Sequence, residues 1–164
     1  MKSFSSHIKN LKLSEKEVRV MPSNKLRAQY NSDRFHLYKS LHKGPDSEAL
    51  RMQYSPHCRF LKLYEDKGKD IFSSVENTAY YKMHRKYGKC HEWTINKIKK
   101  FIALYNNIKA EGYKEDSRVT VFEKPLISNK FNDTYEIWEG HHRVACCIYL
   151  GIKYIPVGIL TSNE

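Results

Sequence analysis

Apolar and polar residues alternate in short stretches near the two ends of the chain and follow a helical spacing between them. Val18 and Val20 alternate with charged residues before Pro22, which predicts a short first strand over 17–21 near a sheet edge. Three later strands are expected on the same grounds, over residues 118–122, 135–138 and 154–160. Pro156 places the last of them at a sheet edge or a strand start. The pattern predicts a small sheet drawn mainly from the C-terminal third.

Between the first strand and the later ones, apolar residues three or four positions apart predict helices. These expected helices cover residues 33–42, 56–67, 78–87, 94–111 and 141–150. The expected N-terminal caps are Ser32 or Asp33 for the first, Ser55 for the second, and Asn77 or Thr78 for the third. Residues 1–13 are expected to form a flexible or loosely docked arm, and residues 126–134 a polar loop. With 164 residues, the chain is predicted to form a single α+β domain.

The net charge exceeds what solubility requires. It is +11, with a pI near 9.4, which favours polyanionic partners such as nucleotides, nucleic acid or acidic surfaces. A merely basic surface is the alternative explanation. No apolar run approaches the roughly 20 residues that span a bilayer, and residues 1–10 lack the apolar centre of a signal peptide. The expected location is cytoplasmic, without membrane attachment.

Cysteine and histidine are frequent enough to raise the question of disulfides or metal. The cysteines are Cys58, Cys90, Cys146 and Cys147. They form no C-x-x-C pair, so reduced thiols are expected. Histidine and cysteine spacings match no zinc signature, which predicts no structural metal site. The possible ligands are His57, Cys58, His84, Cys90, His91, His141 and His142.

The motif with the clearest chemistry is Gly140-His141-His142-Arg143, which joins an expected strand to an expected helix. Gly140 permits a sharp turn, and helical spacing begins at His141. The first N–H groups of a helix have no partner inside it, and the helix dipole is positive there. Such a start therefore attracts anions, above all phosphate. Three cation-capable side chains at this start strengthen the expectation of a phosphate site.

Residues from about 94 to 160 resemble the ParB/sulfiredoxin-like superfamily. The resemblance is carried by Val119 to Phe122, Tyr135 to Trp138, Gly140-His141-His142-Arg143 with Ala145, and Leu150-Gly151 followed by Ile155-Pro156-Val157. It implies an α+β fold with a small mixed sheet of ParB/sulfiredoxin type. Residues 18–26 would supply its first strand, and residues of about 30–93 a largely helical insertion. Members of the superfamily hold nucleotide phosphates at this turn.

Differences from the two best-known branches narrow the activity that the resemblance implies. Gly140, His142 and Arg143 match the Gly-Cys-His-Arg run of sulfiredoxins, but His141 stands where their reactive cysteine lies. Repair of oxidised cysteine is therefore not expected. In ParB proteins the run is similar to Gly-Glu-Arg-Arg and binds CTP, and no helix-turn-helix DNA module is expected after residue 160.

A third branch contains kinases that phosphorylate a free hydroxy amino acid, and similarity to that branch suits the chain best. It implies a kinase-like, nucleotide-dependent phosphotransferase or a nucleotide hydrolase, using ATP, ADP, CTP or another nucleotide with Mg²⁺. The backbone at Gly140 and His141 would hold phosphate, while His142 and Arg143 would neutralise its charge.

A carboxylate would then orient the acceptor hydroxyl or magnesium. Glu139 is the first candidate because it adjoins the glycine turn, with Glu136 and Glu123 as alternatives; an exposed strand end is the competing explanation for Glu139. The candidates for binding a small hydroxyl-bearing acceptor are Ser55, His57 and Arg59, at a helix start that also fits an ordinary capped surface helix.

The rival hypothesis is a nucleic-acid-binding or nuclease-like ParB-type protein without phosphotransfer activity. It is favoured by the net charge of +11 and by the lysines of the long helix, Lys97, Lys99 and Lys100. A solvated helix face explains the same lysines. Electrostatic binding to nucleic acid should weaken steeply with salt, whereas a nucleotide pocket should prefer a particular base or number of phosphates.

Overall fold

Five strands form one mixed sheet in the computed structural model, which describes residues 13–114, 118–124 and 134–162. The strands are β1 (Leu13–Pro22), β2 (Leu26–Arg27), β3 (Val119–Phe122), β4 (Tyr135–Glu139) and β5 (Tyr154–Ser162). Their order is β1-β5-β3-β4-β2, and the successive pairs are antiparallel, parallel, antiparallel and parallel. The expected α+β class is confirmed.

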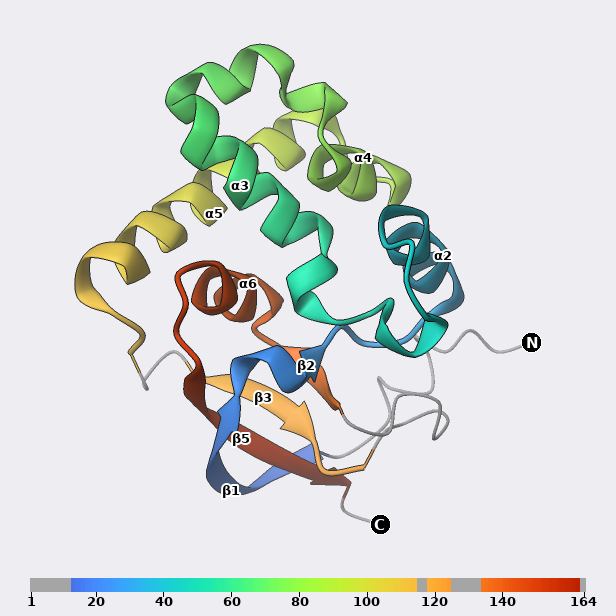
Figure 1. The fold of residues 1–164 in the computed structure, drawn as a ribbon, viewed down its shortest axis with the longest axis vertical. Coiled ribbons are helices and arrows are strands. Elements are labelled where there is room, and N and C mark those ends of the chain that lie inside the picture. The colour runs from blue at the N-terminus through green and yellow to red at the C-terminus, as the bar shows by residue number, and fades with distance from the viewer. Residues whose placement is uncertain (1–12, 115–117, 125–133, 163–164) are drawn as a thin grey trace.

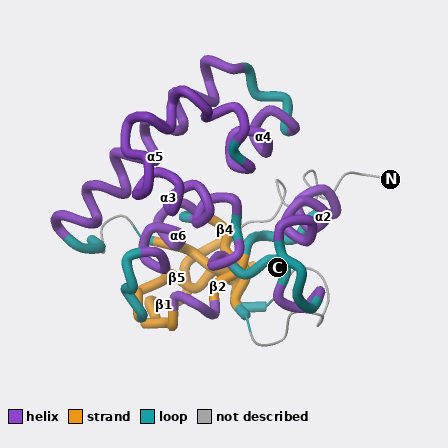
Figure 2. Tube along the Cα trace, turned by 45° about the horizontal axis from the view of Figure 1, so that its top comes forward, coloured by secondary structure: helices purple, strands orange, loops and turns teal. Residues whose placement is uncertain are grey.

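Five α-helices accompany the sheet in the described part of the chain. They are α2 (Ser32–Leu41), α3 (Pro56–Lys67), α4 (Ala79–Lys86), α5 (His91–Glu111) and α6 (His141–Tyr149). Short 3₁₀ segments cover Ser23–Lys25, Asp46–Glu48, Met52–Tyr54 and Gly68–Asn77. In Figure 1, α2 to α5 gather on one side of the molecule, and α6 lies between them and the sheet. Figure 2 shows the same separation of helices from strands. One hydrophobic cluster joins both parts, from Phe60 of α3 to Val121 of β3.

Side-chain caps explain where most of the helices begin. The caps of α2, α3, α4 and α5 are Asn31, Ser55, Thr78 and Cys90, each accepting an N–H from the first turn. Ser55 and Thr78 were expected. Asn31 caps α2 in place of Ser32 or Asp33, and the Cys90 sulfur begins α5 three residues before the predicted Thr94.

The two terminal strands differ from the prediction. β1 has ten residues and begins at Leu13, which overlaps the end of the expected arm; residues 1–12 lie outside the described residues. β5 is not an edge strand, since it pairs with both β1 and β3. Proline has no backbone N–H to donate to a neighbouring strand. Pro156 is paired with Val20 of β1 but lies before Val157, where the parallel pairing with β3 begins, so it is tolerated in this interior strand. The predicted loop over 126–134 falls almost wholly outside the described residues.

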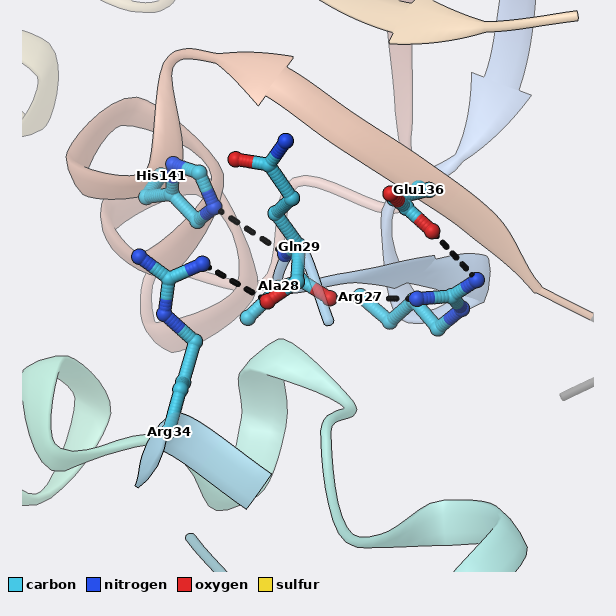
Figure 3. Close-up of polar contacts among 6 residues, drawn as sticks. All are labelled: Arg27, Ala28, Gln29, Arg34, Glu136 and His141. Carbon is cyan, nitrogen blue, oxygen red and sulfur yellow. Dashed lines mark hydrogen bonds and ion pairs between the residues drawn. The ribbon is translucent and has the colours of Figure 1, made fainter. Parts of the chain in front are cut away.

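A buried ion pair ties the two-residue strand β2 to β4. Arg27 stands opposite Glu136 in the parallel register, and its Nη2 lies 2.7 Å from Glu136 Oε2 (Figure 3). Their side chains are 1% and 0% exposed, so the contact is shielded from water. This pair fixes the chain just before the segment that reaches the glycine turn. None of the described helices has the length and apolar character needed to cross a bilayer.

Candidate functional site

A cavity of about 500 Å³ lies where the start of α6 meets helices α2 to α5. The sequence motif contributes Gly140, His141, His142 and Arg143 to its wall. The remaining lining residues come from the helical region: Arg34, Tyr38, His57, Met83, His84, Tyr87, Lys89, Trp93, Lys97, Lys100, Phe101 and Leu104. The motif and the helical region, distant in sequence, therefore enclose one space.

Gly140 shapes the entry of the chain into α6. Its φ of +104° lies in the left-handed region, and a Cβ there would stand 2.9 Å from Val119 Cγ2. The turn thus packs backbone directly against β3. Unlike the other four described α-helices, α6 receives no hydrogen bond from a capping side chain. Its first-turn N–H groups are left for another partner.

Positive charge in the cavity wall comes from arginine and lysine. The cationic lining residues are Arg34, Lys89, Lys97, Lys100 and Arg143. Among the described residues that line the cavity there is no aspartate or glutamate. An anion in this space would meet the open start of α6 and several cations without an opposing carboxylate.

The histidines of the wall are neutral rather than cationic at neutral pH. Burial, aided by Arg34, lowers the pKa of His141 to about 3. Burial also lowers the pKa of His84 to about 4. The pKa values of His57 and His142 lie well below the usual range, chiefly through burial and secondarily through neighbouring cations and imidazoles. Of the three cation-capable side chains expected at the helix start, His141 and His142 are therefore neutral, which leaves Arg143 as the cation.

Contacts from outside the motif hold both of its histidines. The Gln29 backbone N–H donates to His141 Nε2 at 3.4 Å, and Arg34 Nη1 donates to the Gln29 carbonyl at 2.6 Å (Figure 3). On the other side, the Tyr80 hydroxyl lies 2.7 Å from His142 Nε2. The ring of His142 also meets His57, with centroids 4.6 Å apart. The imidazoles are thus fixed in orientation before any ligand arrives.

Of the three candidates for binding an acceptor, the structure places only one in the cavity wall. His57 is 4% exposed and lines the cavity. Ser55 is fully buried and caps α3, and Arg59 is exposed and donates to the Leu41 carbonyl. Neither is a lining residue.

The carboxylate candidates all lie outside the cavity wall. Glu139 is exposed at the end of β4. Glu136 forms an ion pair with Arg27, and Glu123 Oε1 lies 2.6 Å from Lys16 Nζ.

Several lining residues were not singled out from the sequence. Arg34 is one of them, and so are the two aromatic residues Tyr87 and Trp93, which are 37% and 39% exposed. Lys89 Nζ lies 4.9 Å from the centroid of the Trp93 ring. The sequence positions of these residues give no sign that they share a cavity with the distant Gly140–Arg143 motif, because that depends on how α2, α4 and α5 pack.

The lysines of α5 divide between two environments. Lys97 and Lys100 line the cavity and Lys99 does not, although Lys99 and Lys100 are both exposed. At positions three apart, Lys97 and Lys100 share a helix face. The pKa of Lys97 is lowered by burial and by the charge of Lys100. Two of the three lysines therefore belong to the same site as the motif.

Thiols and metal ligands contribute little to this site. Cys146 and Cys147 are buried inside α6, and burial raises their pKa values. Across residues 13–114, 118–124 and 134–162, no three histidine, cysteine or acidic side chains are grouped so as to hold a metal ion. Comparison of the chain with protein-family models, curated proteins and solved structures finds no match.

Proposed function

We propose that the protein binds a nucleotide through its phosphates in this cavity and acts as a nucleotide-dependent phosphotransferase or nucleotide hydrolase of the ParB/sulfiredoxin-like type. One observation carries the proposal. The uncapped start of α6 and five cationic side chains converge on a cavity of about 500 Å³, whose described lining contains no carboxylate. Open N–H groups and cations are the donors that phosphate oxygens require.

The expected roles follow from position. The backbone at Gly140 and His141 would hold a phosphate at the helix start, and Arg143 and Lys97 would stabilise charge on the phosphoryl group as it is transferred. His142 would contribute a hydrogen bond rather than a charge, because its pKa lies well below neutral pH. Tyr87 and Trp93 offer aromatic surface against which a base could stack.

The lining fits a nucleotide better than it fits a side-chain-bound magnesium ion. Mg²⁺ prefers carboxylate and other oxygen ligands, and the described lining offers no carboxylate. The described lining therefore gives Mg²⁺ no carboxylate ligand. The same observation removes the support for Glu139 as the group that activates an acceptor hydroxyl.

Adjacent lysines allow a matched test of ligand placement. Isothermal titration calorimetry with ATP, ADP, CTP and GTP should identify the nucleotide that binds with the highest affinity. Its affinity should fall about tenfold or more in Arg143→Ala and several-fold in Lys100→Ala, because each loses a charge-assisted contact. Lys99→Ala removes the same charge from the same helix outside the cavity and should change the affinity by less than about twofold. Equal effects of Lys99→Ala and Lys100→Ala would contradict this placement.

The reaction itself needs a separate measurement. Phosphorus NMR of the preferred nucleotide with wild-type protein and a panel of small hydroxy compounds should show transfer to an acceptor or to water. Binding without any turnover would restrict the protein to nucleotide binding.

The rival function, nucleic-acid binding, is favoured by the net charge of +11. Binding of DNA or RNA should weaken steeply with salt and should respond to Lys99→Ala as much as to Lys100→Ala, because external charge drives it. Nucleic-acid affinity exceeding that for every nucleotide at 150 mM salt would favour the rival.

A further inference from the structure

The two histidines of the motif share a feature that their sequence does not reveal. Each is engaged at Nε2 by a group from another element: the Gln29 N–H follows β2 and reaches His141 (Figure 3), and the Tyr80 hydroxyl of α4 reaches His142. The 2.7 Å contact to Tyr80 is the shorter of the two, and that to Gln29 is 3.4 Å.

The direction of both hydrogen bonds can be assigned. A backbone N–H only donates, so His141 Nε2 accepts and carries no proton. Tyr80 is fully buried, and burial raises the pKa of its hydroxyl, which therefore stays protonated. In the described part of the chain, His142 Nε2 is the partner of that hydroxyl. A buried hydroxyl proton without an acceptor costs free energy, which favours donation from Tyr80 to His142.

We propose that Gln29 and Tyr80 hold His141 and His142 as neutral Nδ1–H tautomers, so that both rings donate hydrogen bonds to phosphate oxygens of the ligand. This inference rests on the proposed function, because it requires an anion in the cavity. Nδ1 is the ring nitrogen nearer the backbone. Both histidines line the cavity at the start of α6, whose first-turn N–H groups have no side-chain cap. Tyr80 and Gln29 are positioning residues.

Neutral donors suit the electrostatics of this wall. The charge of Arg34 opposes protonation of His141, and the charges of Lys97 and Arg143 oppose protonation of His142. The motif supplies directed N–H groups while arginine and lysine supply charge. A pair of donors selects a fully ionised phosphate oxygen, since a P–OH proton would find no acceptor on these rings.

Two replacements of His142 separate the ring nitrogens. Asparagine places an amide nitrogen near the position of Nδ1, and glutamine places one near Nε2. With inorganic tripolyphosphate as the titrated probe, His142→Asn should keep the affinity within about threefold. His142→Gln should lose about tenfold or more, as expected for a lost hydrogen bond to a charged group. Equal losses in the two variants, or a larger loss in His142→Asn, would overturn the assignment.

Tyrosine variants test the positioning role with a matched control. Nitrogen-15 NMR of wild-type protein should show His142 protonated at Nδ1, with its signal assigned by its disappearance in His142→Asn. Tyr80→Phe should yield a mixture of tautomers and a weaker affinity for tripolyphosphate. Tyr81→Phe removes a similar bond, 2.8 Å to His91 Nδ1, in a pair outside the cavity, and should leave both readouts unchanged.

The outcomes distinguish the two proposals. Wild-type protein that binds neither tripolyphosphate nor any nucleotide contradicts the proposed function. Wild-type protein that binds tripolyphosphate but shows His142 protonated at Nε2, or a Tyr80→Phe spectrum identical to wild type, contradicts only the tautomer assignment.

Discussion

At the residue scale, the buried pair of Arg27 and Glu136 is a contact at which substitution should be costly. Both side chains are almost fully shielded from water, and their N–O distance is 2.7 Å. Removal of one partner leaves the other charge buried without compensation. The pair also secures the segment that carries Gln29, the residue that contacts His141.

Glu136→Gln should lower the free energy of unfolding by roughly 3–5 kcal/mol, because the Arg27 charge would remain buried without its counter-ion. Urea denaturation at pH 7.5 measures the change. Glu17→Gln breaks the exposed pair with Arg19 and should cost less than about 1 kcal/mol. Similar values for the two variants would show that the buried pair contributes no more than a surface pair.

At the element scale, the turn from β4 into α6 depends on a single glycine. Gly140→Ala should destabilise the protein, since alanine would meet both an unfavourable φ and the Val119 side chain. We expect a loss of roughly 2–4 kcal/mol, read from thermal or urea unfolding, together with loss of nucleotide binding.

Gly112 gives the matched comparison for that variant. Its φ is +81°, but a Cβ there would meet nothing within 4 Å. Gly112→Ala should therefore show only the backbone penalty, of order 1 kcal/mol, and retain ligand binding. If Gly140→Ala were as stable as Gly112→Ala, the Val119 side chain would have moved to accommodate the added methyl group at little cost.

Element boundaries followed local chemistry where that chemistry was visible in the sequence. Ser55 followed by Pro56 predicted the start of α3, and Gly140 predicted the start of α6. The start of α5 was missed because a cysteine sulfur, an uncommon cap, accepts the Trp93 N–H. The interior position of β5 was missed because the penalty of Pro156 depends on which neighbour faces it, and pairing is a tertiary property.

At the scale of the whole molecule, several imidazoles are buried without charge around one cavity. The lowered pKa values belong to His57, His84, His141 and His142. In the unfolded chain each titrates near 6.5. Below that pH the unfolded state binds more protons than the folded state, so stability is lost as pH falls from about 6.5 toward the folded values.

The free energy of unfolding should accordingly drop between pH 7 and pH 5, by up to about 1.4 kcal/mol per pH unit for each histidine that stays neutral. Urea denaturation at several pH values measures this slope. His84→Gln should make it shallower by about one proton, since His84 is 8% exposed with a pKa of about 4. His36→Gln, on the exposed side of α2, should leave it unchanged. An equally steep slope in His84→Gln would mean that this ring is protonated in the folded protein.

The motif was recognisable from sequence, but the walls of its cavity were not. Gly140 to Arg143 carry a local signal of a turn into a helix, whereas Arg34 and Trp93 become neighbours of that turn only through helix packing. The same holds for charge. A count of cation-capable residues cannot show that burial leaves His141 neutral.

The pairing of β1 with β5 has a consequence for how the chain acquires its structure. Leu13 stands opposite Ser162, and Pro22 opposite Tyr154, so the two strands are separated by more than 130 residues of sequence. During synthesis, β1 leaves the ribosome first and stays without its partner strand until the last residues of β5 are made. Closing so long a loop is slow. Molecules arrested before residue 154 should therefore leave β1 without its partner strand.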